Sequence, residues 1–283
     1  MNHRQNFLSA CLLGIVALAG GTSPVFAATA PMLGAASGFT VLSAAPAHGG
    51  AVTCTDSTIS GDVGSSGMRA SVVQTTCTIT GAIVAPVSAQ VLDGFNTAYA
   101  ALAALSCDQV LTGTLAGVTL APGVYCFDAA ATLTGTLTLA GPENGIWVFK
   151  IGTSGTGALT GTNFSVVMAN GAQACNVFWQ VAEAATMTTS DFKGTILAGA
   201  AITITGGTFN GNALAKAAVT LTGVAATGCE GGRFIPAKQR CNQGVGNGPE
   251  ACDPGNSNQG NPFRSNDELG GVPGNPGRKG GNK

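Results

Sequence analysis

The chain has 283 residues, a formal net charge of -1, 9 % charged residues, 45 % hydrophobic residues and 43 glycines. This composition excludes intrinsic disorder for most of the chain, since disorder combines high charge with few apolar residues. It also excludes nucleic acid as a partner, because no basic stripe is present to neutralise phosphates. A long chain rich in Gly, Thr and Ala is typical of stacked β-structure with small corner residues.

Residues 1–27 have the features of a secretory signal peptide: a basic start, an apolar run over 7–19 and small residues up to Ala27. We therefore expect a secreted, extracellular protein, with association at the cell surface as the alternative. The letters LSAC at 8–11 match a bacterial lipoprotein box, but the apolar run continues past Cys11 and too little chain precedes it. No other segment is long and apolar enough to span a membrane.

Nine cysteines become eight when Cys11 leaves with the leader, and an even number in an exported chain indicates disulfides. Sequence does not fix the connectivity, but proximity along the chain suggests three pairs, Cys54 with Cys77, Cys107 with Cys126 and Cys241 with Cys252. This leaves Cys175 for Cys229. There is no CxxC pair, and His48 is the only histidine after the leader, so we expect no metal and no cofactor.

Residues 28–38 are assigned to an N-terminal linker and residues 39–229 to one β-domain. The first part of that domain alternates short apolar and Thr/Ser runs with glycine, which is typical of short strands. Residues 86–106 break the pattern, because apolar residues recur three and four apart and Pro86 suits a first helical turn. We expect one helix there, about 30 Å long, lying across about six strands. Its predicted contacts are Val87, Val91, Phe95, Tyr99 and Leu102.

Strand-like sequence returns after Cys107, and two of its stretches repeat at a spacing of 17 residues. FKGTILAGAAITITG at 192–206 matches FNGNALAKAAVTLTG at 209–223 in Phe, Gly, Leu, Ala, Thr-x-Thr and Gly. Such repetition predicts stacked coils, and 17 residues are too few for a leucine-rich repeat or a propeller blade. We therefore predict a mainly β fold, a three-faced β-solenoid with the helix packed alongside.

Residues 230–283 are rich in Gly, Asn and Pro and poor in aliphatic residues, so they cannot bury a core. We interpret them as a disulfide loop followed by a flexible tail. Several oxygen-bearing side chains there invite a calcium site, but their spacing matches no calcium loop, and a solvated linker is favoured. They are Asp253, Asn256, Asn258, Asp267 and Glu268.

Threonines occupy alternate positions of the repeated strands. Since side chains along a strand alternate between faces, Thr203 and Thr205 point away from the apolar Ile202 and Ile204. Stacked coils would align such threonines in two ladders, about 4.8 Å apart between coils and about 6.6 Å along each strand. An ordinary soluble sheet surface is the alternative, because Thr favours strands. Most such surfaces carry Lys, Glu or Arg, however, and their absence from these positions favours a surface that orders water or meets a crystal.

Evidence for catalysis is thin, because the carboxylates are dispersed along the chain. They are Asp56, Asp62, Asp93, Asp108, Asp128, Glu143, Glu183 and Asp191. Glycosidases and lyases of β-helical form cluster such groups in a groove. Trp147 and Trp179 lie within apolar stretches and suit core packing better than sugar stacking, and His48 has no evident catalytic partner. We therefore expect no enzymatic activity.

Together these stretches resemble the microbial ice-binding proteins, a family of right-handed β-solenoids with one long α-helix alongside. The resemblance covers about 39–229 and rests on AYAALAALSC at the helix end, LAPGVYCF at 120–127, IWVFKIG at 146–152 and NGAQACNVFWQV at 170–181. It implies a flat face that adsorbs to ice. Many members also carry a capping subdomain before the helix, and the short SSGMRASVVQTTC stretch here indicates that it is absent or much reduced.

Some members of that family carry a loose Thr-(Ala/Gly)-x-(Thr/Asn) motif near the flat face. TGTN at 160–163 and TGGT at 205–208 match it here. We take TTSD at 188–191 as the corresponding place in the coil between them, where the pattern is broken.

The sequence thus predicts a secreted monomer that adsorbs to ice and inhibits ice growth and recrystallisation without any chemistry. The predicted ice-binding residues are Thr160, Thr162, Asn163, Thr186, Thr188, Thr203, Thr205, Thr208, Thr220 and Thr222. The alternative is an extracellular adhesin or matrix module whose β-solenoid lacks ice affinity. An exported carbohydrate-active enzyme ranks third.

Overall fold

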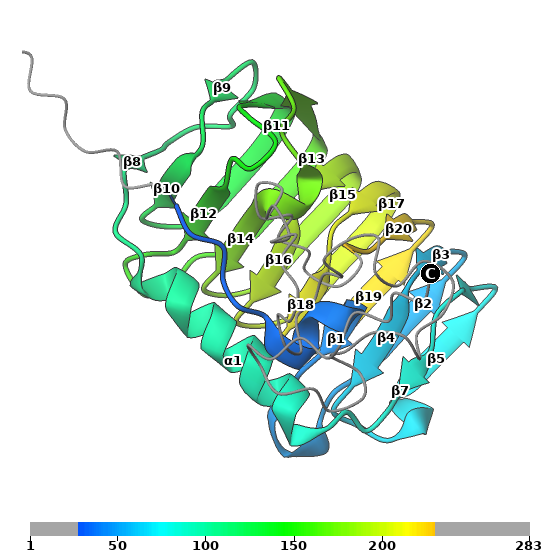
Figure 1. Cartoon of the computed structure of the whole chain (residues 1–283). Coiled ribbons are helices and arrows are strands. Elements are labelled where there is room, and N and C mark those ends of the chain that lie inside the picture. The colour runs from blue at the N-terminus through cyan, green and yellow to red at the C-terminus, as the bar shows by residue number, and fades with distance from the viewer. Residues whose placement is uncertain (1–27, 230–283) are drawn as a thin grey trace, which may run out of the picture.

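The computed structural model describes residues 28–229 (Figure 1). The predicted leader, the expected Cys241–Cys252 pair and the residues considered for calcium lie outside the described residues. Within the described range, no helix is both long and apolar enough to cross a membrane.

Two sheets of parallel strands form the body of the protein. The nine-stranded sheet contains, in spatial order, β7 (Ile83–Val84), β4 (Asp62–Ser65), β1 (Phe39–Ser43), β18 (Ala213–Ala215), β16 (Thr195–Ala198), β14 (Val177–Val181), β12 (Trp147–Ile151), β10 (Gly123–Phe127) and β8 (Gln109–Val110). The larger sheet contains β5 (Val72–Thr75), β2 (Val52–Thr55), β19 (Val219–Thr222), β17 (Ile202–Asn210), β15 (Ala185–Lys193), β13 (Leu159–Ala169), β11 (Ala131–Ala140) and β9 (Thr119–Leu120). It also contains β20 (Ala225–Thr227), which pairs with β17 and β3 (Thr58–Ser60), and β6 (Thr78–Ile79), which pairs with β3.

The larger sheet supplies two of the three faces, because its long strands turn a corner midway. In β17, residues 202–205 pair with β19 and residues 208–210 pair with β20. We call the nine-stranded sheet the helix face. The threonine face comprises β2, β5, β19 and the first halves of β11, β13, β15 and β17. The third face comprises their second halves with β3, β6, β9 and β20. The predicted three-faced β-solenoid is confirmed, and its handedness stays a prediction.

The coils do not stack in the order in which the chain makes them. After β7, the helix α1 (Ala89–Ala104) carries the chain to the far end of the solenoid, and the later coils return toward the start (Figure 1). The last coil then meets the first: β18 pairs with β1 and β19 pairs with β2. Two regions of the chain that are remote in sequence therefore share each face.

The predicted helix is confirmed but is shorter than 86–106. It begins at Ala89 after the N-cap Ser88, so Pro86 precedes the helix instead of occupying its first turn. The reason is that the backbone N–H of Val87 donates to the carbonyl of Ser65, which ties this residue to the end of β4.

One stripe of α1 packs on the helix face. Its buried residues are Val91, Phe95, Ala98 and Leu102. They join one apolar cluster with side chains from six strands, as the length of the helix predicted: Leu42, Val124, Val148, Phe178, Leu197 and Leu214. Burying each large apolar side chain contributes about 1.5–3 kcal/mol, so this contact fixes the helix firmly to the solenoid.

A lysine from β12 supports the end of the helix. Lys150 is buried, and its Nζ donates a 2.5 Å hydrogen bond to the carbonyl of Leu105, which follows α1. Burial lowers the pKa of Lys150. The ammonium lies where the helix dipole is negative, which makes the contact favourable.

Residues 28–38, which the sequence assigned to a linker, include the 3-10 helix η1 (Gly34–Gly38), and Leu33 and Ala36 are buried in the cluster beneath α1. Gly94 permits this contact, since a Cβ there would lie 2.5 Å from the carbonyl oxygen of Leu33. The remaining 3-10 turns are η2 (Pro46–His48), η3 (Arg69–Ser71) and η4 (Ala174–Asn176). Between β4 and β6 the chain forms η3 and β5, in agreement with a reduced capping segment.

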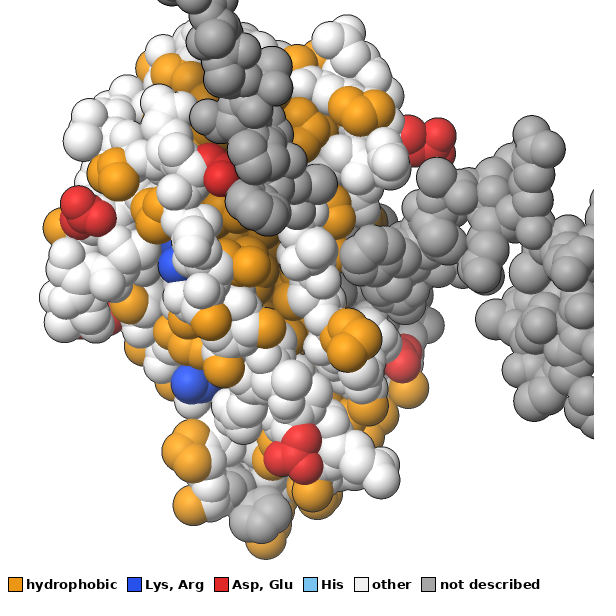
Figure 2. Space-filling model, turned by 60° about the vertical axis from the view of Figure 1, so that its left-hand side comes forward, with side chains coloured by type: hydrophobic (Ala, Val, Ile, Leu, Met, Phe, Trp, Pro, Cys, Tyr) orange, Lys and Arg blue, Asp and Glu red, His pale blue; other side chains and the backbone are white. Residues whose placement is uncertain are grey.

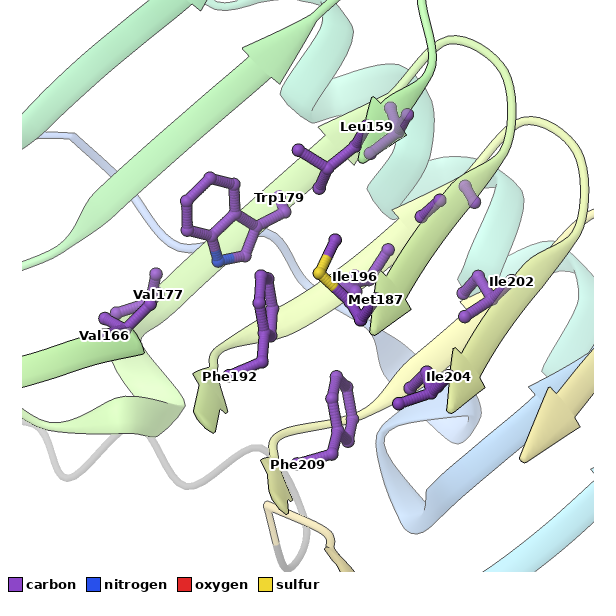
Figure 3. Close-up of a cluster of buried hydrophobic side chains, with 14 of the residues drawn as sticks. Leu159, Val166, Val177, Trp179, Met187, Phe192, Ile196, Ile202, Ile204 and Phe209 are labelled. Carbon is purple, nitrogen blue, oxygen red and sulfur yellow. The ribbon is translucent and has the colours of Figure 1, made fainter. Parts of the chain in front are cut away.

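Aromatic rings stack from coil to coil inside the solenoid (Figure 3). Phe149 and Trp179 have ring centroids 3.9 Å apart, and Phe192 and Phe209 have centroids 5.7 Å apart. Both tryptophans are fully buried, and each indole N–H donates to a backbone carbonyl, Trp147 to Leu120 and Trp179 to Lys193. The prediction that they belong to the core is confirmed.

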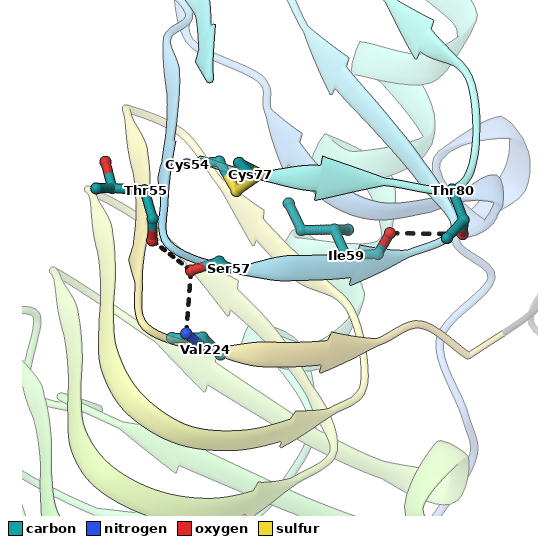
Figure 4. Close-up of a disulfide and its surroundings, with 7 residues drawn as sticks. All are labelled: Cys54, Thr55, Ser57, Ile59, Cys77, Thr80 and Val224. Carbon is teal, nitrogen blue, oxygen red and sulfur yellow. Dashed lines mark hydrogen bonds between the residues drawn. A yellow bond between two sulfur atoms is a disulfide. The ribbon is translucent and has the colours of Figure 1, made fainter. Parts of the chain in front are cut away.

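Three of the predicted disulfides are confirmed: Cys54–Cys77, Cys107–Cys126 and Cys175–Cys229. The first lies at the corner of the N-terminal coils, close to Ser57 (Figure 4). The Ser57 hydroxyl donates to the carbonyl of Thr55 and accepts from the N–H of Val224, so it joins this coil to the last one of the chain.

Candidate functional site: the threonine face

The two predicted threonine ladders are present on the threonine face. In one ladder Thr160, Thr186, Thr203 and Thr220 are successive partners across β13, β15, β17 and β19. In the other ladder the partners are Thr162, Thr188, Thr205 and Thr222. The residues that alternate with these threonines in β15, β17 and β19 are buried: Ala185, Met187, Ile202, Ile204, Val219 and Leu221.

Both ladders continue beyond the residues that the sequence predicted. Since β2 docks beside β19, Thr53 follows Thr220 and Thr55 follows Thr222. One strand further, Thr75 of β5 extends the second ladder, while Val73 ends the first. At the other end, Thr132 of β11 precedes Thr160.

These four threonines, Thr53, Thr55, Thr75 and Thr132, were missed. The Thr-x-Thr pattern is visible in TCTD at 53–56 and TLTG at 132–135. Neither stretch stands at the spacing of 17 that relates Thr186, Thr203 and Thr220, and neither matches the motif that identified TGTN. The chain order also places 53–56 far from β19.

The residue after each second threonine turns the backbone from the threonine face to the third face. These corner residues have left-handed backbone with φ of 47° at Asn163, 46° at Thr189, 67° at Gly206, 64° at Gly223 and 48° at Asp56. Gly, Asn and Asp tolerate that conformation, whereas a β-branched Thr rarely adopts it. Asn163, a predicted site residue, therefore lies at the edge of the face. Its Oδ1 accepts a 2.6 Å hydrogen bond from the hydroxyl of Thr189.

The two Thr-(Ala/Gly)-x-(Thr/Asn) matches are not equivalent in the structure. TGTN starts at Thr160, which is in register with Thr186 and Thr203, whereas TGGT starts two positions later, at Thr205. TTSD corresponds to TGGT, because Thr188 pairs with Thr205 and Asp191 with Thr208. The interpretation that it also corresponds to TGTN is wrong, because on the β13 side Thr188 pairs with Thr162 and not with Thr160. The stretch in register with TGTN is TMTT at 186–189, which keeps Thr at the first and third positions.

The glycine in TGTN is required by packing inside the protein. Gly161 is buried, and a Cβ at this position would lie 2.6 Å from the Met187 sulfur.

Thr208 is separate from the two ladders. It lies past the corner, on the third face, in register with Asp191. Its hydroxyl donates a 2.5 Å hydrogen bond to Asp191, whose other oxygen accepts from Lys193 at 2.7 Å. Burial acts to raise the pKa of Asp191, but the hydrogen bonds from Lys193 and Thr208 and the charge of Lys193 outweigh it and lower that pKa.

The ladder positions carry no ionisable side chain. Glu183 and Lys216 lie at the corner between the helix face and the threonine face, and Lys216 rests 4.1 Å above the ring of Tyr99 on α1. Charged side chains are also few and separated on the side of the molecule in Figure 2.

Within residues 28–229, no three His, Cys, Asp or Glu side chains are grouped so that they could hold a metal ion. The face offers threonine hydroxyls and methyls on a rigid sheet, which suits adsorption to an extended surface.

Comparison with known proteins identifies the family. Residues 46–227 match the family described as ice-binding-like. The chain belongs to this family. It is 39 % identical over 199 residues to an ice-binding protein of Nostoc sp. (strain HG1), covering 68 % of this chain and 71 % of that protein. It is 33 % identical over 223 residues to ice-binding protein K1-A of Typhula ishikariensis, covering 69 % and 88 %.

Solved structures of ice-binding proteins share the fold. One from an Antarctic biological consortium is 32 % identical with a TM-score of 0.64, covering 73 % of this chain and 95 % of that chain. Another, from the Antarctic ascomycete Antarctomyces psychrotrophicus, is 36 % identical with a TM-score of 0.61, covering 70 % and 98 %.

Proposed function

We propose that this protein is secreted, adsorbs to ice through the threonine face as a monomer, and inhibits ice growth and recrystallisation without catalysing a reaction. The observation that carries the proposal is the continuity of the ladders. Thr-x-Thr recurs in register across β13, β15, β17, β19 and β2, with no ionisable side chain at these positions. Membership of the ice-binding-like family and the names of the relatives support it.

The physical basis is the regularity of the array. Parallel hydrogen-bonded strands repeat at about 4.8 Å, and alternate residues along a strand repeat at about 6.6 Å. Threonine is stiff at χ1, so each hydroxyl and methyl keeps a fixed place. Buried apolar residues lie directly behind the array. Hydroxyls that bond water and methyls that confine it order the first hydration layer, which then joins the growing crystal.

Adsorption of this kind requires the whole surface and no reactive group. A bound molecule holds back the growth front where it sits, so the effect depends on the contact area and on the absence of protruding or charged side chains. The apolar interior and the disulfides keep the surface unchanged while it is bound.

The test compares two exposed threonines, one on the threonine face and one on the third face. Thr205→Tyr places a bulky ring in the middle of the threonine face, and Thr58→Tyr places the same ring on the third face. We expect Thr205→Tyr to abolish most thermal hysteresis and recrystallisation inhibition, and Thr58→Tyr to leave both unchanged. The free energy of unfolding of each variant should stay within about 0.5 kcal/mol of the wild-type value, since both sites are at the surface.

Two outcomes would contradict the proposal in different ways. If Thr205→Tyr keeps full activity, another face contacts the ice. If the wild-type protein neither shapes ice nor slows recrystallisation, the function itself is wrong, and an extracellular adhesin or matrix module becomes the favoured reading.

A further inference from the structure

A cavity of about 330 Å³ lies between the N-terminal segment 30–37 and the helix face. One of its walls is a column with one residue from each coil, Phe178, Thr195 and Asn212, which follow one another at a spacing of 17 residues. Phe178 pairs with Thr195, and the N–H of Ile196 donates a 2.8 Å hydrogen bond to the carbonyl of Asn212. The column is therefore part of the hydrogen-bonded body of the solenoid.

The side chains of this column point out of the solenoid and toward the cavity. The next residue in each coil, Trp179, Ile196 or Ala213, belongs to the apolar cluster inside the solenoid. Neighbouring side chains of a strand point to opposite sides, so the column faces the N-terminal segment. Phe178 accordingly lies in the other apolar cluster, together with Leu33. The amide of the asparagine in the column is thus directed at the cavity.

This amide has one unmatched end. The side chain of Asn212 is 1 % exposed, and its Oδ1 accepts a 2.8 Å hydrogen bond from the N–H of Cys229. The other end, Nδ2, has no hydrogen-bond acceptor among residues 28–229. A buried donor without a partner is costly, and proteins rarely leave one unsatisfied. A molecule in the cavity should therefore bring an acceptor oxygen to Nδ2.

The rest of the wall is mostly apolar and carries no charge. Leu33, Phe178 and the Cys175–Cys229 disulfide contribute apolar surface, and Thr195 adds a hydroxyl. Within the described part of the chain, no Asp, Glu, Lys, Arg or His side chain lines the cavity. Small-molecule sites are typically concave and mostly apolar, with a few placed polar groups and volumes of roughly 300–1,000 Å³. An ion would lose its hydration here without gaining a charged partner, so the wall selects a neutral molecule.

We propose that this cavity binds a small uncharged carbonyl compound, such as a ketone or an ester. Its carbonyl oxygen accepts a hydrogen bond from Asn212 Nδ2, and its apolar body lies against Leu33 and Phe178. The bound molecule holds the N-terminal segment against the helix face. None of the wall residues belongs to the threonine face, so this site is separate from the proposed ice contact.

Nuclear magnetic resonance of the isotope-labelled full chain tests the site directly, with cyclohexanone as the probe. We expect intermolecular nuclear Overhauser effects between cyclohexanone and both the Leu33 methyls and the Phe178 ring. Methylenecyclohexane is the matched control probe, because it has nearly the same shape and lacks the oxygen. These contacts are measured on the wild-type protein, so they remain informative even if a variant does not fold.

A pair of variants tests the role of the amide. Asn212→Asp keeps an acceptor for the N–H of Cys229 and replaces the Nδ2 donor with an oxygen. It should weaken cyclohexanone binding by about tenfold, as expected for the loss of one hydrogen bond, and leave methylenecyclohexane binding unchanged. Asn210→Asp makes the same change at an exposed position of β17 that does not line the cavity, and it should leave the affinity for both probes unchanged.

Three results would overturn the proposal. Without Overhauser effects from cyclohexanone to the wall at saturating probe, the cavity holds only water. If Asn212→Asp weakens the binding of both probes equally, the amide does not recognise the carbonyl oxygen. Overhauser effects from Leu33 to residues outside 28–229 in the probe-free protein would make the chain itself the occupant.

Discussion

The threonine face and the third face are built from the same strands, yet they carry different outer residues. In β15 and β17 the outward positions before the corner are threonines, while those after it include Asp191, Lys193 and Thr208. Along the third face the positions in register with Asp191 run Thr136, Ser165, Asp191, Thr208, Ala225, Thr58 and Thr78. That row mixes a charge and an alanine with hydroxyls, and it carries an ion pair.

This difference separates the needs of the fold from the needs of the surface. Both faces have parallel strands, the same hydrogen-bonded coils and buried aromatic or aliphatic residues beneath them. If strand preference alone placed threonine on the outside, both faces would carry it equally. The uniform threonines on one face therefore support the proposal that this face contacts ice.

The largest expected effect comes from removing a buried ring behind the third face. Phe192 is fully buried in β15 and stacks on Phe209. Phe192→Ala should lower the free energy of unfolding by about 3–5 kcal/mol, measured by chemical denaturation. Near 0 °C the protein that stays folded should keep its ice activity, because the outward threonines are unchanged. If Phe192→Ala removed ice activity without lowering the free energy of unfolding, the prediction would be wrong, and this buried ring would be needed for ice binding itself.

A medium effect tests whether the threonine face continues across the junction of the first and last coils. Thr55→Glu puts a charge on the second ladder in β2, and Thr58→Glu puts the same charge on the third face three residues later. We expect Thr55→Glu to reduce ice affinity by about tenfold, or ~1.4 kcal/mol, in an ice-partitioning assay. Thr58→Glu should have no effect. Equal behaviour of the two variants would confine the active surface to the C-terminal coils.

The smallest effect concerns the ion pair of the third face. Because the folded state lowers the pKa of Asp191 below the usual value of 3.8, its contribution to stability is present above that value and is lost as pH falls below it. The carboxylate is about half exposed, so the contribution is less than about 1 kcal/mol. Asp191→Asn should therefore flatten the acid limb of a stability-against-pH curve slightly. Ice activity at neutral pH should stay at the wild-type level, and a clear loss would bring the third face into the contact.

The sequence by itself determined the local features of this protein. Alternation of apolar residues and threonine has a period of two, so it reveals which side chains of a strand face outward wherever the strand lies. The apolar spacing of 86–106 identified the helix and its buried residues Val91, Phe95 and Leu102, since a helical stripe is also a local pattern. Tyr99, also predicted, is only partly buried, and the buried Ala98 was not predicted. Cysteines close in sequence had few partners within reach, and three of the four proposed pairs are confirmed.

Only the tertiary structure decided how these local features combine. Pairing of β2 with β19 joins residues more than 160 positions apart in the chain, and such contacts follow from packing and backbone hydrogen bonds that no local pattern encodes. Thr53 and Thr55 entered the threonine face in this way. Left-handed residues such as Asn163 and Gly206 set where each strand turns. All residues after a corner lie on the next face of the solenoid. Thr208 follows such a corner and therefore lies on the third face, outside the ladders. For the same reason the similar motifs TGTN and TGGT occupy different positions relative to the corner.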